Sequence, residues 1–327
     1  MNWKNKKVLV TGAGGFIGSH LAERLVKEGA NVKAVVHYNA LGTAGWLQES
    51  TLRRDMEIVY GDVRDSDWIN EVTAGSETIF HLAALIAIPY SYHAPRSYVQ
   101  TNIEGTLNLL QAARNSNVEC FVQTSTSEVY GSAQTPLISE QHPLHPQSPY
   151  AASKVGSDKL AESYHLSFKL PVVIARPFNT FGPRQSARAI IPTIITQALA
   201  KNVVKLGNVH PTRDLNFVSN TVEGFLAAAS TPKAIGQTFN FGSGREITIG
   251  DLAELILKLI GKDVRLETES ERQRPAGSEV TRLQADSTLA NQVLNWTAKK
   301  TLEEGLVETI EWLRQHLGRY QTESYVV

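Results

Sequence analysis

Short apolar runs alternate with longer segments in which apolar residues recur at helical spacing, starting near the first residue. A short apolar run predicts a strand that is buried on both faces, as in a parallel sheet covered by helices. Regular alternation of strands and helices predicts a doubly wound α/β fold of the Rossmann type, whose ligands lie at the carboxyl ends of the strands. The expected strands are residues 8–10, 32–36, 57–60, 78–82, 120–124 and 172–175, and the expected helices are 19–27, 95–116 and 150–167.

The pattern changes after residue 176, where the loops lengthen and prolines and arginines spread out. We expect residues 1–176 to form one domain and residues 177–327 to form mainly a smaller, interleaved α/β domain. Segments near 214–243 are expected to return to the first sheet. The later elements are expected at 238–241 (strand), 249–261 (helix), 264–267 (strand) and 302–317 (helix), followed by a tail at 318–327 that is poorly ordered or used in assembly.

A glycine-rich turn follows the first strand, with Gly12, Gly15 and Gly18 spaced G-x-x-G-x-x-G. Glycine allows a tight reversal and lets a pyrophosphate approach the amides at the N-terminus of the next helix. The spacing differs from the commoner G-x-G-x-x-G dinucleotide fingerprint. We interpret residues 1–176 as a dinucleotide-binding domain. The alternative is a tight strand-to-helix turn that binds nothing.

Composition excludes several classes of function. Lys and Arg total 32, as do Asp and Glu, so no bulk charge attracts nucleic acid or an anionic membrane. The single cysteine, Cys120, lies in a strand-like run and is expected to be a buried thiol. No apolar run reaches the roughly 18 residues of a membrane span, and the N-terminal apolar run is too short for a signal peptide. We expect a cytoplasmic protein.

The adenosine end of the predicted cofactor site departs from the common pattern. The acidic residue that usually follows the second strand and holds a ribose is missing, and His37 stands there. No arginine replaces it, so the choice between NAD and NADP stays open at this point. Asp62, after the third strand, suits the adenine amino group, although acidic turn residues are common there.

Tyr150 and Lys154 form a Y-x-x-x-K pair and project from one face of a helix. A nearby ammonium, together with a positive nicotinamide, is expected to lower the pKa of a tyrosine from about 10 toward neutrality. The phenol then becomes a general base for a sugar hydroxyl. A chance occurrence of the spacing is the alternative. The pair gains weight because it follows a segment rich in hydroxyls.

That segment, residues 124–131, ends the fifth expected strand, where catalytic residues of such sheets lie. Its hydroxyls and the Glu128 carboxylate are the polar groups that a sugar site needs. A capped turn rich in Ser and Thr is the alternative interpretation.

Taken together, these features resemble the extended short-chain dehydrogenase/reductase superfamily over nearly the whole chain. The matching residues, in order, are Thr11, Gly12, Gly15, Gly18, Asp62, His81 to Ala84, Asn102, Tyr150, Lys154 and Arg176 to Asn179. The resemblance implies a tightly bound, recycled NAD, with NADP as the alternative. The implied cofactor contacts are Gly12, Gly15, Phe16, Ile17, Gly18, His37, Asp62, Val63, Leu82, Ala83, Ala84, Asn102, Thr124, Tyr150 and Lys154.

Within this superfamily, residues 125–131 resemble the signature of nucleotide-sugar 4,6-dehydratases. The dTDP-glucose enzymes carry Thr-Asp-Glu at the central positions, whereas GDP-mannose dehydratases carry Thr-Ser-Glu. This chain has Thr126, Ser127 and Glu128, so it resembles the GDP-sugar type. Residues 85–92 and 179–188 resemble the dehydratases of legionaminic-acid biosynthesis, which act on GDP-N-acetylglucosamine.

The resemblance implies a role for each catalytic candidate. Tyr150 removes the proton of the sugar 4-hydroxyl while C4 is oxidised, and Lys154 holds the ribose and lowers the pKa of the tyrosine. Thr126 hydrogen-bonds the 4-oxygen. Glu128 removes the C5 proton that the new ketone acidifies, and water leaves from C6. Because Ser127 replaces an aspartic acid, protonation of the leaving hydroxyl falls to Glu128 or to a water held by Ser127.

Polar residues after the sixth strand are expected to bind a nucleotide-diphosphate sugar, because guanidinium groups bind phosphate oxygens bidentately. A surface or structural role is the alternative for any single arginine. The resemblance also implies a homodimer or higher homo-oligomer through helices 95–116 and 150–167. The histidines show no ligand spacing, so no metal site is expected. The substrate-binding candidates are Asn179, Arg184, Arg188, Arg213 and Arg274.

Two other functions remain open. A nucleotide-sugar 4-epimerase needs Tyr150 and Lys154 but no base at C5, so Glu128 discriminates between the two reactions. A non-catalytic dinucleotide-binding sensor needs none of the three residues. A decarboxylase or reductase of the same superfamily is the remaining possibility.

Overall fold

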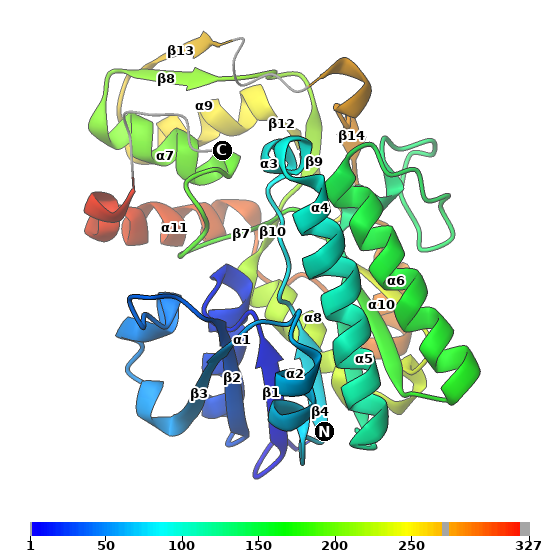
Figure 1. Cartoon of the computed structure of the whole chain (residues 1–327). Helices are drawn as coiled ribbons and strands as arrows, with labels where there is room; N and C mark the ends of the chain where they lie inside the picture. Colours follow the sequence, from blue (N-terminus) through cyan, green and yellow to red (C-terminus); the bar gives the residue numbers. More distant parts are fainter. Residues whose placement is uncertain (1, 270–274, 321–327) are drawn as a thin grey trace.

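The computed structural model describes residues 2–269 and 275–320 (Figure 1). Its centre is a seven-stranded parallel sheet in the order β11-β6-β5-β4-β1-β2-β3. The order reverses beside β1, as in doubly wound sheets, so the predicted fold class is confirmed. The strands are β1 (Lys7–Thr11), β2 (Asn31–His37), β3 (Met56–Gly61), β4 (Thr78–His81), β5 (Cys120–Thr124), β6 (Val172–Pro177) and β11 (Thr238–Phe241).

Apolar side chains of the central strands serve two hydrophobic cores in alternation. Leu9 belongs to one core, whereas Val8 and Val10 belong to the core on the opposite face. Successive strand side chains point to opposite faces, so a strand covered on both sides must be apolar throughout. This is why the short apolar runs located the strands in the sequence.

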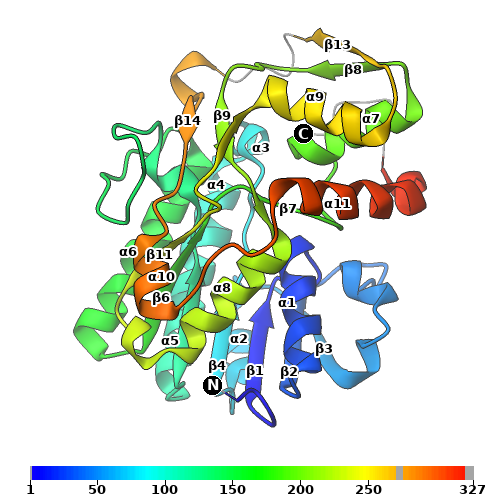
Figure 2. The ribbon, with the colours of Figure 1, turned by 180° about the vertical axis from the view of Figure 1, so that it is seen from behind.

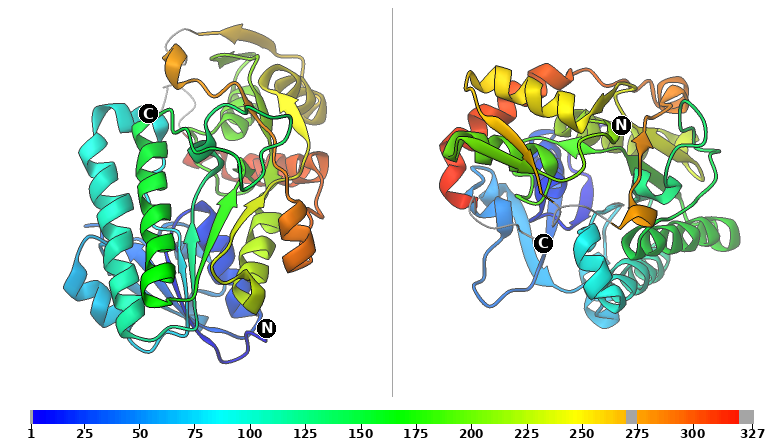
Figure 3. Two further views of the ribbon diagram at one scale, coloured as in Figure 1. Left: turned by 90° about the vertical axis from the view of Figure 1, so that its right-hand side faces the viewer. Right: turned by 90° about the horizontal axis from the view of Figure 1, so that it is seen from above.

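Helices cover both faces of the sheet, as the rear and side views show (Figures 2 and 3). Helices α1 and α8 pack against each other on one face, and α2, α5 and α6 pack on the other. The predicted return of residues 238–241 is confirmed, since β11 extends the sheet beside β6. The helices named here are α1 (Phe16–Lys27), α2 (Ser66–Thr73), α5 (Gly105–Asn115), α6 (Pro149–Phe168) and α8 (Val218–Ser230).

The helix expected at 95–116 is found at 95–115, but it is not α-helical throughout. It consists of α4 (Pro95–Tyr98), a π-helical segment (Val99–Glu104) and α5. Single π turns within α-helices occur frequently at functional sites. Here the π segment carries Asn102, which is buried. The apolar spacing alone did not distinguish this segment from an α-helix.

Most of the chain after residue 181 forms a smaller lobe beyond the carboxyl ends of the central strands (Figure 1). It contains two small sheets, in the orders β12-β9-β14 and β13-β8. A further pair, β7 (Thr180–Phe181) with β10 (Asn216–Phe217), lies where the chain enters and leaves this lobe. Its elements are α7 (Ile190–Ala200), β8 (Val203–Leu206), β9 (Thr212–Asp214), β12 (Glu246–Thr248), α9 (Ile249–Ile260), β13 (Arg265–Thr268), β14 (Arg282–Leu283) and α11 (Leu302–His316). The division near residue 176 stays a prediction, and α8, β11 and α10 (Thr288–Leu294) belong with the central sheet.

The end of the described chain packs back onto the connection between β2 and β3. The Trp312 ring of α11 meets Trp46 edge-on, with centroids 5.4 Å apart, and the Arg319 guanidinium lies 5.5 Å from the Trp46 ring centroid. The Tyr320 hydroxyl donates to the carbonyl of Gln185 at 2.8 Å. Residues 318–320 are therefore packed, contrary to the expectation of a loose tail. Residues 321–327 lie outside the described part of the chain.

Within the described residues, no helix combines the length and the apolar character that crossing a membrane requires.

Candidate active site

The glycine-rich turn lies between β1 and α1, and its own backbone requires two of the glycines. Gly12 has a φ of 70°, and a Cβ there would lie 2.8 Å from the Ala83 nitrogen. A Cβ at Gly18 would collide with the carbonyl of Gly12. These two positions are thus explained by close backbone approach.

The start of α1 indicates what the turn can bind. Gly15 is the N-cap, no side chain caps the helix, and the first turn carries no acidic residue. The first amides of a helix have no intrahelical acceptor and favour an anion. Phe16, Ile17 and Gly18 are the residues of that first turn. The geometry supports the predicted phosphate contact.

The adenosine candidates lie together at the ends of β2 and β3, where His37 pairs with Gly61 in register. Asp62 accepts two hydrogen bonds from Arg64 Nε at 3.0 Å, and this arginine holds the pKa of the carboxyl below its usual range. The exposed His37 has its Nδ1 3.9 Å from Asp62. Val63 is buried and packs against Gly105. The site therefore presents a fixed carboxylate beside a histidine.

A buried network that sequence reasoning left out of the site joins β1, β4 and the π segment through His81. Thr106 donates to the carbonyl of Asn102 at 2.6 Å, so it accepts from His81 Nε2 at 3.1 Å. Nδ1 of the ring then accepts from the Thr11 hydroxyl at 2.8 Å. Burial lowers the pKa of His81 to about 3, with a smaller contribution from the Lys154 charge. The ring is neutral, with its proton on Nε2.

Thr11 continues this network to the cofactor candidates after β4. Its hydroxyl oxygen accepts from the amides of Leu82 and Ala83, both at 3.1 Å. The sequence signal for this network was His81, which ends a strand and precedes the apolar residues 82–84. Ala84 follows in the same segment.

Asn102 acts on the same segment from the other side. Its Oδ1 accepts from the Leu85 amide at 2.8 Å, and its Nδ2 donates to the Leu85 carbonyl at 3.0 Å and to Ser153 at 2.9 Å. The side chain thus ties the loop after β4 to α6. This geometry gives Asn102 a positioning role, and its direct contact with a cofactor stays a prediction.

Tyr150 and Lys154 are buried on α6 and face the carboxyl end of β5. The Lys154 ammonium donates to the carbonyl of Thr124 at 2.6 Å. Burial lowers the pKa of Lys154 to about 8, against the opposing charge of Asp158. The Thr124 hydroxyl is buried and has no partner among the described residues.

The expected lowering of the Tyr150 pKa by Lys154 is not found. Burial raises the pKa of the phenol, the Thr126 hydrogen bond opposes this rise, and the Glu128 charge adds to it. Desolvation disfavours phenolate, and it outweighs the favourable contacts that the polypeptide supplies.

The candidate catalytic turn, η4 (Ser127–Tyr130), follows β5 and is capped by Thr126. The Thr126 hydroxyl accepts from the Glu128 amide at 3.3 Å and also bonds Tyr150. Ser127 and Glu128 are both buried, and the Glu128 carboxylate lies close enough to Tyr150 to affect its pKa. The structure therefore brings the phenol, a hydroxyl and a carboxylate together.

The predicted substrate contacts differ in their surroundings. Asn179, after β6, has a buried Oδ1 without a partner among the described residues. Arg188 is exposed, and its charge affects the pKa of Tyr98, whose ring meets that of Tyr150 edge-on. Arg213 is buried beside Glu279. Arg274 lies outside the described residues.

Arg184 is paired within the protein. Its guanidinium donates to Ser19 at 3.1 Å and to Glu23 at 3.0 Å, both on α1. It therefore bridges the segment after β7 to the first helix, and its contact with a substrate phosphate stays a prediction. An arginine on a loop can reach several partners, so its spacing in sequence could not predict this ion pair.

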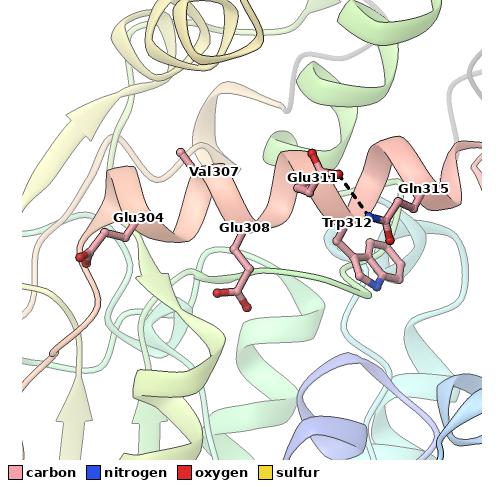
Figure 4. A pocket seen from close by; sticks show the side chains of 6 residues that line it. All are labelled: Glu304, Val307, Glu308, Glu311, Trp312 and Gln315. Atoms are coloured by element: carbon pink, nitrogen blue, oxygen red, sulfur yellow. Dashed lines mark hydrogen bonds between the residues drawn. The ribbon is translucent and has the colours of Figure 1, made fainter.

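The hollow drawn in Figure 4 lies elsewhere. It is a shallow depression along α11, and none of the predicted site residues lines it. Within it, Gln315 donates to Glu311 at 3.2 Å. It contributes no chemistry to the arrangement around Tyr150. The lining residues are Glu304, Val307, Glu308, Glu311, Trp312 and Gln315.

Comparison with known proteins places the chain in a family. A family model described as GDP-mannose 4,6 dehydratase matches residues 9–309. A dTDP-glucose 4,6-dehydratase of Actinoplanes sp. is 33% identical over 317 residues, covering 94% of this chain and 98% of the relative. A UDP-glucose 4-epimerase of Mycolicibacterium smegmatis is 34% identical over 314 residues, with coverage of 94% and 98%.

A solved structure extends the similarity to the whole fold. The crystal structure of DesIV, a dTDP-glucose 4,6-dehydratase of Streptomyces venezuelae with NAD and TYD bound, has a TM-score of 0.87 at 29% identity and covers 96% of this chain and 98% of that chain. The relatives are enzymes, and they include both dehydratases and epimerases. The chain belongs to the GDP-mannose 4,6-dehydratase family, within the superfamily of nucleotide-sugar dehydratases and epimerases.

Proposed function

We propose that this protein is an NAD-dependent nucleotide-sugar 4,6-dehydratase whose substrate is a GDP-sugar, GDP-N-acetylglucosamine first among them. The observation that carries the proposal is the buried Glu128 carboxylate beside Tyr150. A carboxylate is costly to bury unless it is paired or hydrogen-bonded, so a buried one calls for an explanation. An acid–base residue next to a phenol is what proton removal at a second carbon requires.

The residues around the glycine-rich turn fit a dinucleotide. The uncapped start of α1 suits its pyrophosphate, and Asp62 and His37 suit its adenosine. We propose NAD in preference to NADP because the DesIV structure holds NAD. A dinucleotide held by these residues would supply hydride transfer, from C4 of the sugar and back to C6. We propose that the cofactor stays tightly bound through the cycle.

Tyr150 takes the proton of the 4-hydroxyl, and Thr126 hydrogen-bonds the 4-oxygen. Because burial raises the pKa of the phenol, Tyr150 needs added positive charge to act as a base at neutral pH. Lys154, held by the Thr124 carbonyl, and a cationic ring nearby would supply this charge. Tyr150 can therefore remove the 4-hydroxyl proton only when the cationic ring is also in place.

Glu128 removes the C5 proton, which the 4-ketone has made acidic. The C6 hydroxyl then leaves as water, protonated by Glu128 or by a water that Ser127 holds. A proton from solvent returns to C5, and the proton held by Tyr150 goes to solvent. The substrate therefore loses one molecule of water and no net electrons.

The triplet Thr126, Ser127 and Glu128 supports the GDP-sugar assignment, since it matches the GDP-type signature and not the dTDP type. We propose Asn179, Arg188 and Arg213 as contacts to the nucleotide sugar, and Arg274 as a further contact. The unpartnered Oδ1 of Asn179 supports the first of these, because buried polar atoms in proteins are normally hydrogen-bonded.

We propose a homodimer through the helices on one face of the sheet. Val99, Leu107 and Leu166 are exposed apolar side chains on the π segment, α5 and α6. Pairing of these helices with those of a second copy would remove this surface from water.

The second candidate is a nucleotide-sugar 4-epimerase, which the similarity to the UDP-glucose 4-epimerase favours. Incubation with GDP-N-acetylglucosamine, GDP-mannose, UDP-N-acetylglucosamine and dTDP-glucose separately distinguishes the two. We expect one GDP-sugar to lose the mass of one water and to give a 4-keto product. A product of unchanged mass with inverted C4 would establish the epimerase. Dehydration of only a UDP- or dTDP-sugar would overturn the donor assignment.

A further inference from the structure

A buried ion pair joins α6 to β6 next to the candidate catalytic turn. The guanidinium of Arg176 donates from Nε and Nη2 to Asp158 Oδ2, at 3.2 and 3.0 Å. The exposed fraction is 4% for Arg176 and 1% for Asp158. A buried pair costs desolvation energy that is often not recovered in stability, so its retention calls for another explanation.

Each member of the pair also binds one end of the turn. Ser125 donates to Asp158 Oδ2 at 2.6 Å, immediately before Thr126. Arg176 Nη1 donates to the Tyr130 hydroxyl at 2.9 Å, and its guanidinium carbon lies 4.9 Å from the ring centroid. Tyr130 ends the turn. One ion pair therefore holds a residue on each side of the candidate catalytic triplet, Ser125 before it and Tyr130 after it.

The Tyr130 end has a second anchor in β11. Its hydroxyl donates to Asn240 Oδ1 at 2.8 Å, and Asn240 Nδ2 donates to the Ile138 carbonyl at 3.0 Å. The backbone amide of Asn240 also donates to the Glu140 carboxylate, at 2.8 Å. All these groups are buried or partly buried, so the Tyr130 ring has little freedom to move.

The Asp158 end lies on the same helix face as the catalytic pair. Asp158 follows Lys154 by four residues, one helical turn. Lys154 binds the Thr124 carbonyl, and Asp158 binds the next side chain, Ser125. Two consecutive residues at the end of β5 are thus fixed to the helix that carries Tyr150.

We propose that Asp158 and Arg176 are positioning residues that hold Ser125 and Tyr130, and so fix the Glu128 carboxylate relative to Tyr150. The inference rests on the proposed dehydratase, in which Glu128 acts at C5. The two acid–base groups come from different elements, α6 and the turn after β5. A connection between these two elements is needed to keep the distance between Glu128 and Tyr150 constant. Displacement of a catalytic group by about 1 Å can cost about a hundredfold in rate.

The test removes one hydroxyl from each end of the turn. Tyr130→Phe and Ser125→Ala keep the ion pair and are compared with Tyr164→Phe and Ser163→Ala, two residues of α6 whose hydroxyls lie outside this network. We expect kcat for dehydration to fall about tenfold or more in the first two variants, with KM unchanged. The kinetic isotope effect with a C5-deuterated substrate should rise in these variants, because C5 deprotonation becomes slower than C4 oxidation. The controls should match the wild type.

Hydrogen–deuterium exchange provides a readout that does not depend on the reaction. The peptide covering residues 124–131 should exchange faster in Tyr130→Phe and Ser125→Ala than in the controls. If Tyr130→Phe does not fold, Ser125→Ala carries the same test. Unchanged kcat, isotope effect and exchange in a wild type that dehydrates its substrate would overturn the positioning role and leave the function intact. If the wild type dehydrates none of the donors, the proposed function fails, and exchange alone decides whether the turn is held as proposed.

Discussion

The two sides of the candidate site differ in how completely the chain satisfies its own polar groups. On the cofactor side, the hydroxyl of Thr11, both ring nitrogens of His81 and the Thr106 hydroxyl are all hydrogen-bonded within the protein. On the substrate side, Asn179 Oδ1 is buried without a partner among the described residues.

This difference teaches where a ligand is needed. A closed network has its geometry whether or not a ligand binds, and it serves to place the backbone. A buried polar atom without a partner costs free energy that a ligand or a water can recover. We therefore expect mutations on the cofactor side to act on stability and dinucleotide binding, and mutations on the substrate side to act on turnover.

The largest expected effect is that of Glu128→Gln, which keeps the shape of the side chain and removes the base. Dehydration should fall about a thousandfold, while oxidation at C4 continues. The measurement is formation of the 4-keto-6-deoxy product, together with the near-ultraviolet absorbance that reports C4 oxidation. Glu162→Gln, an exposed carboxylate on α6, is the matched control. Wild-type dehydration by Glu128→Gln would contradict the assigned base.

Gly18→Ala should have the second largest effect, because the new Cβ would meet the backbone carbonyl of Gly12. We expect a loss of about 3 kcal/mol in the free energy of unfolding, from overpacking, together with weaker NAD binding. Denaturant titration measures the free energy of unfolding, and calorimetry measures the affinity for NAD. Gly250→Ala is the control, since a Cβ there lies 3.6 Å from its nearest neighbour. Equal stability of both variants would show that the turn relaxes.

Acid pH should break the closed network through His81. The folded-state pKa of about 3 lies below the unfolded value, so the unfolded chain binds more protons between them. Stability therefore falls as pH decreases through this interval, by about 2 kcal/mol between pH 7 and pH 5. Urea unfolding at both pH values measures it. His81→Gln should flatten the pH dependence, whereas His210→Gln, at an exposed site, should retain it.

The smallest effect separates two arginines of one segment. Arg188→Ala should raise KM for the nucleotide sugar about tenfold, the value of one charged hydrogen bond. Arg184→Ala should leave KM within about twofold and cost about 1 kcal/mol of stability, because its partners are Ser19 and Glu23. Steady-state kinetics measures KM, and thermal unfolding of the same preparations measures stability. The reverse pattern would return Arg184 to the substrate site.

The sequence predicts the central sheet well because its strands are apolar on both faces. β5 was expected at the residues where it is found, and the return of β11 was also foreseen. The π segment was not, since it spans only 6 residues within a longer helical run.

For the site, short-range motifs located Tyr150, Lys154 and the turn at Thr126 to Glu128, which the structure brings together. The sequence could not show that burial raises the pKa of Tyr150, that Arg184 bridges to α1 or that Asp158 meets Arg176. These depend on the tertiary placement of residues far apart in the chain.

The packing of Arg319 and Trp312 on Trp46 has a practical consequence. The backbone amide of Trp46 donates to the carbonyl of Gly14 at 2.9 Å, so this one residue connects α11 with the glycine-rich turn. A purification tag at the carboxyl terminus would follow this packed segment in the sequence. The N-terminus lies at the amino ends of the central strands, away from the smaller lobe (Figure 1), so a tag there is the better choice for measuring dinucleotide affinity.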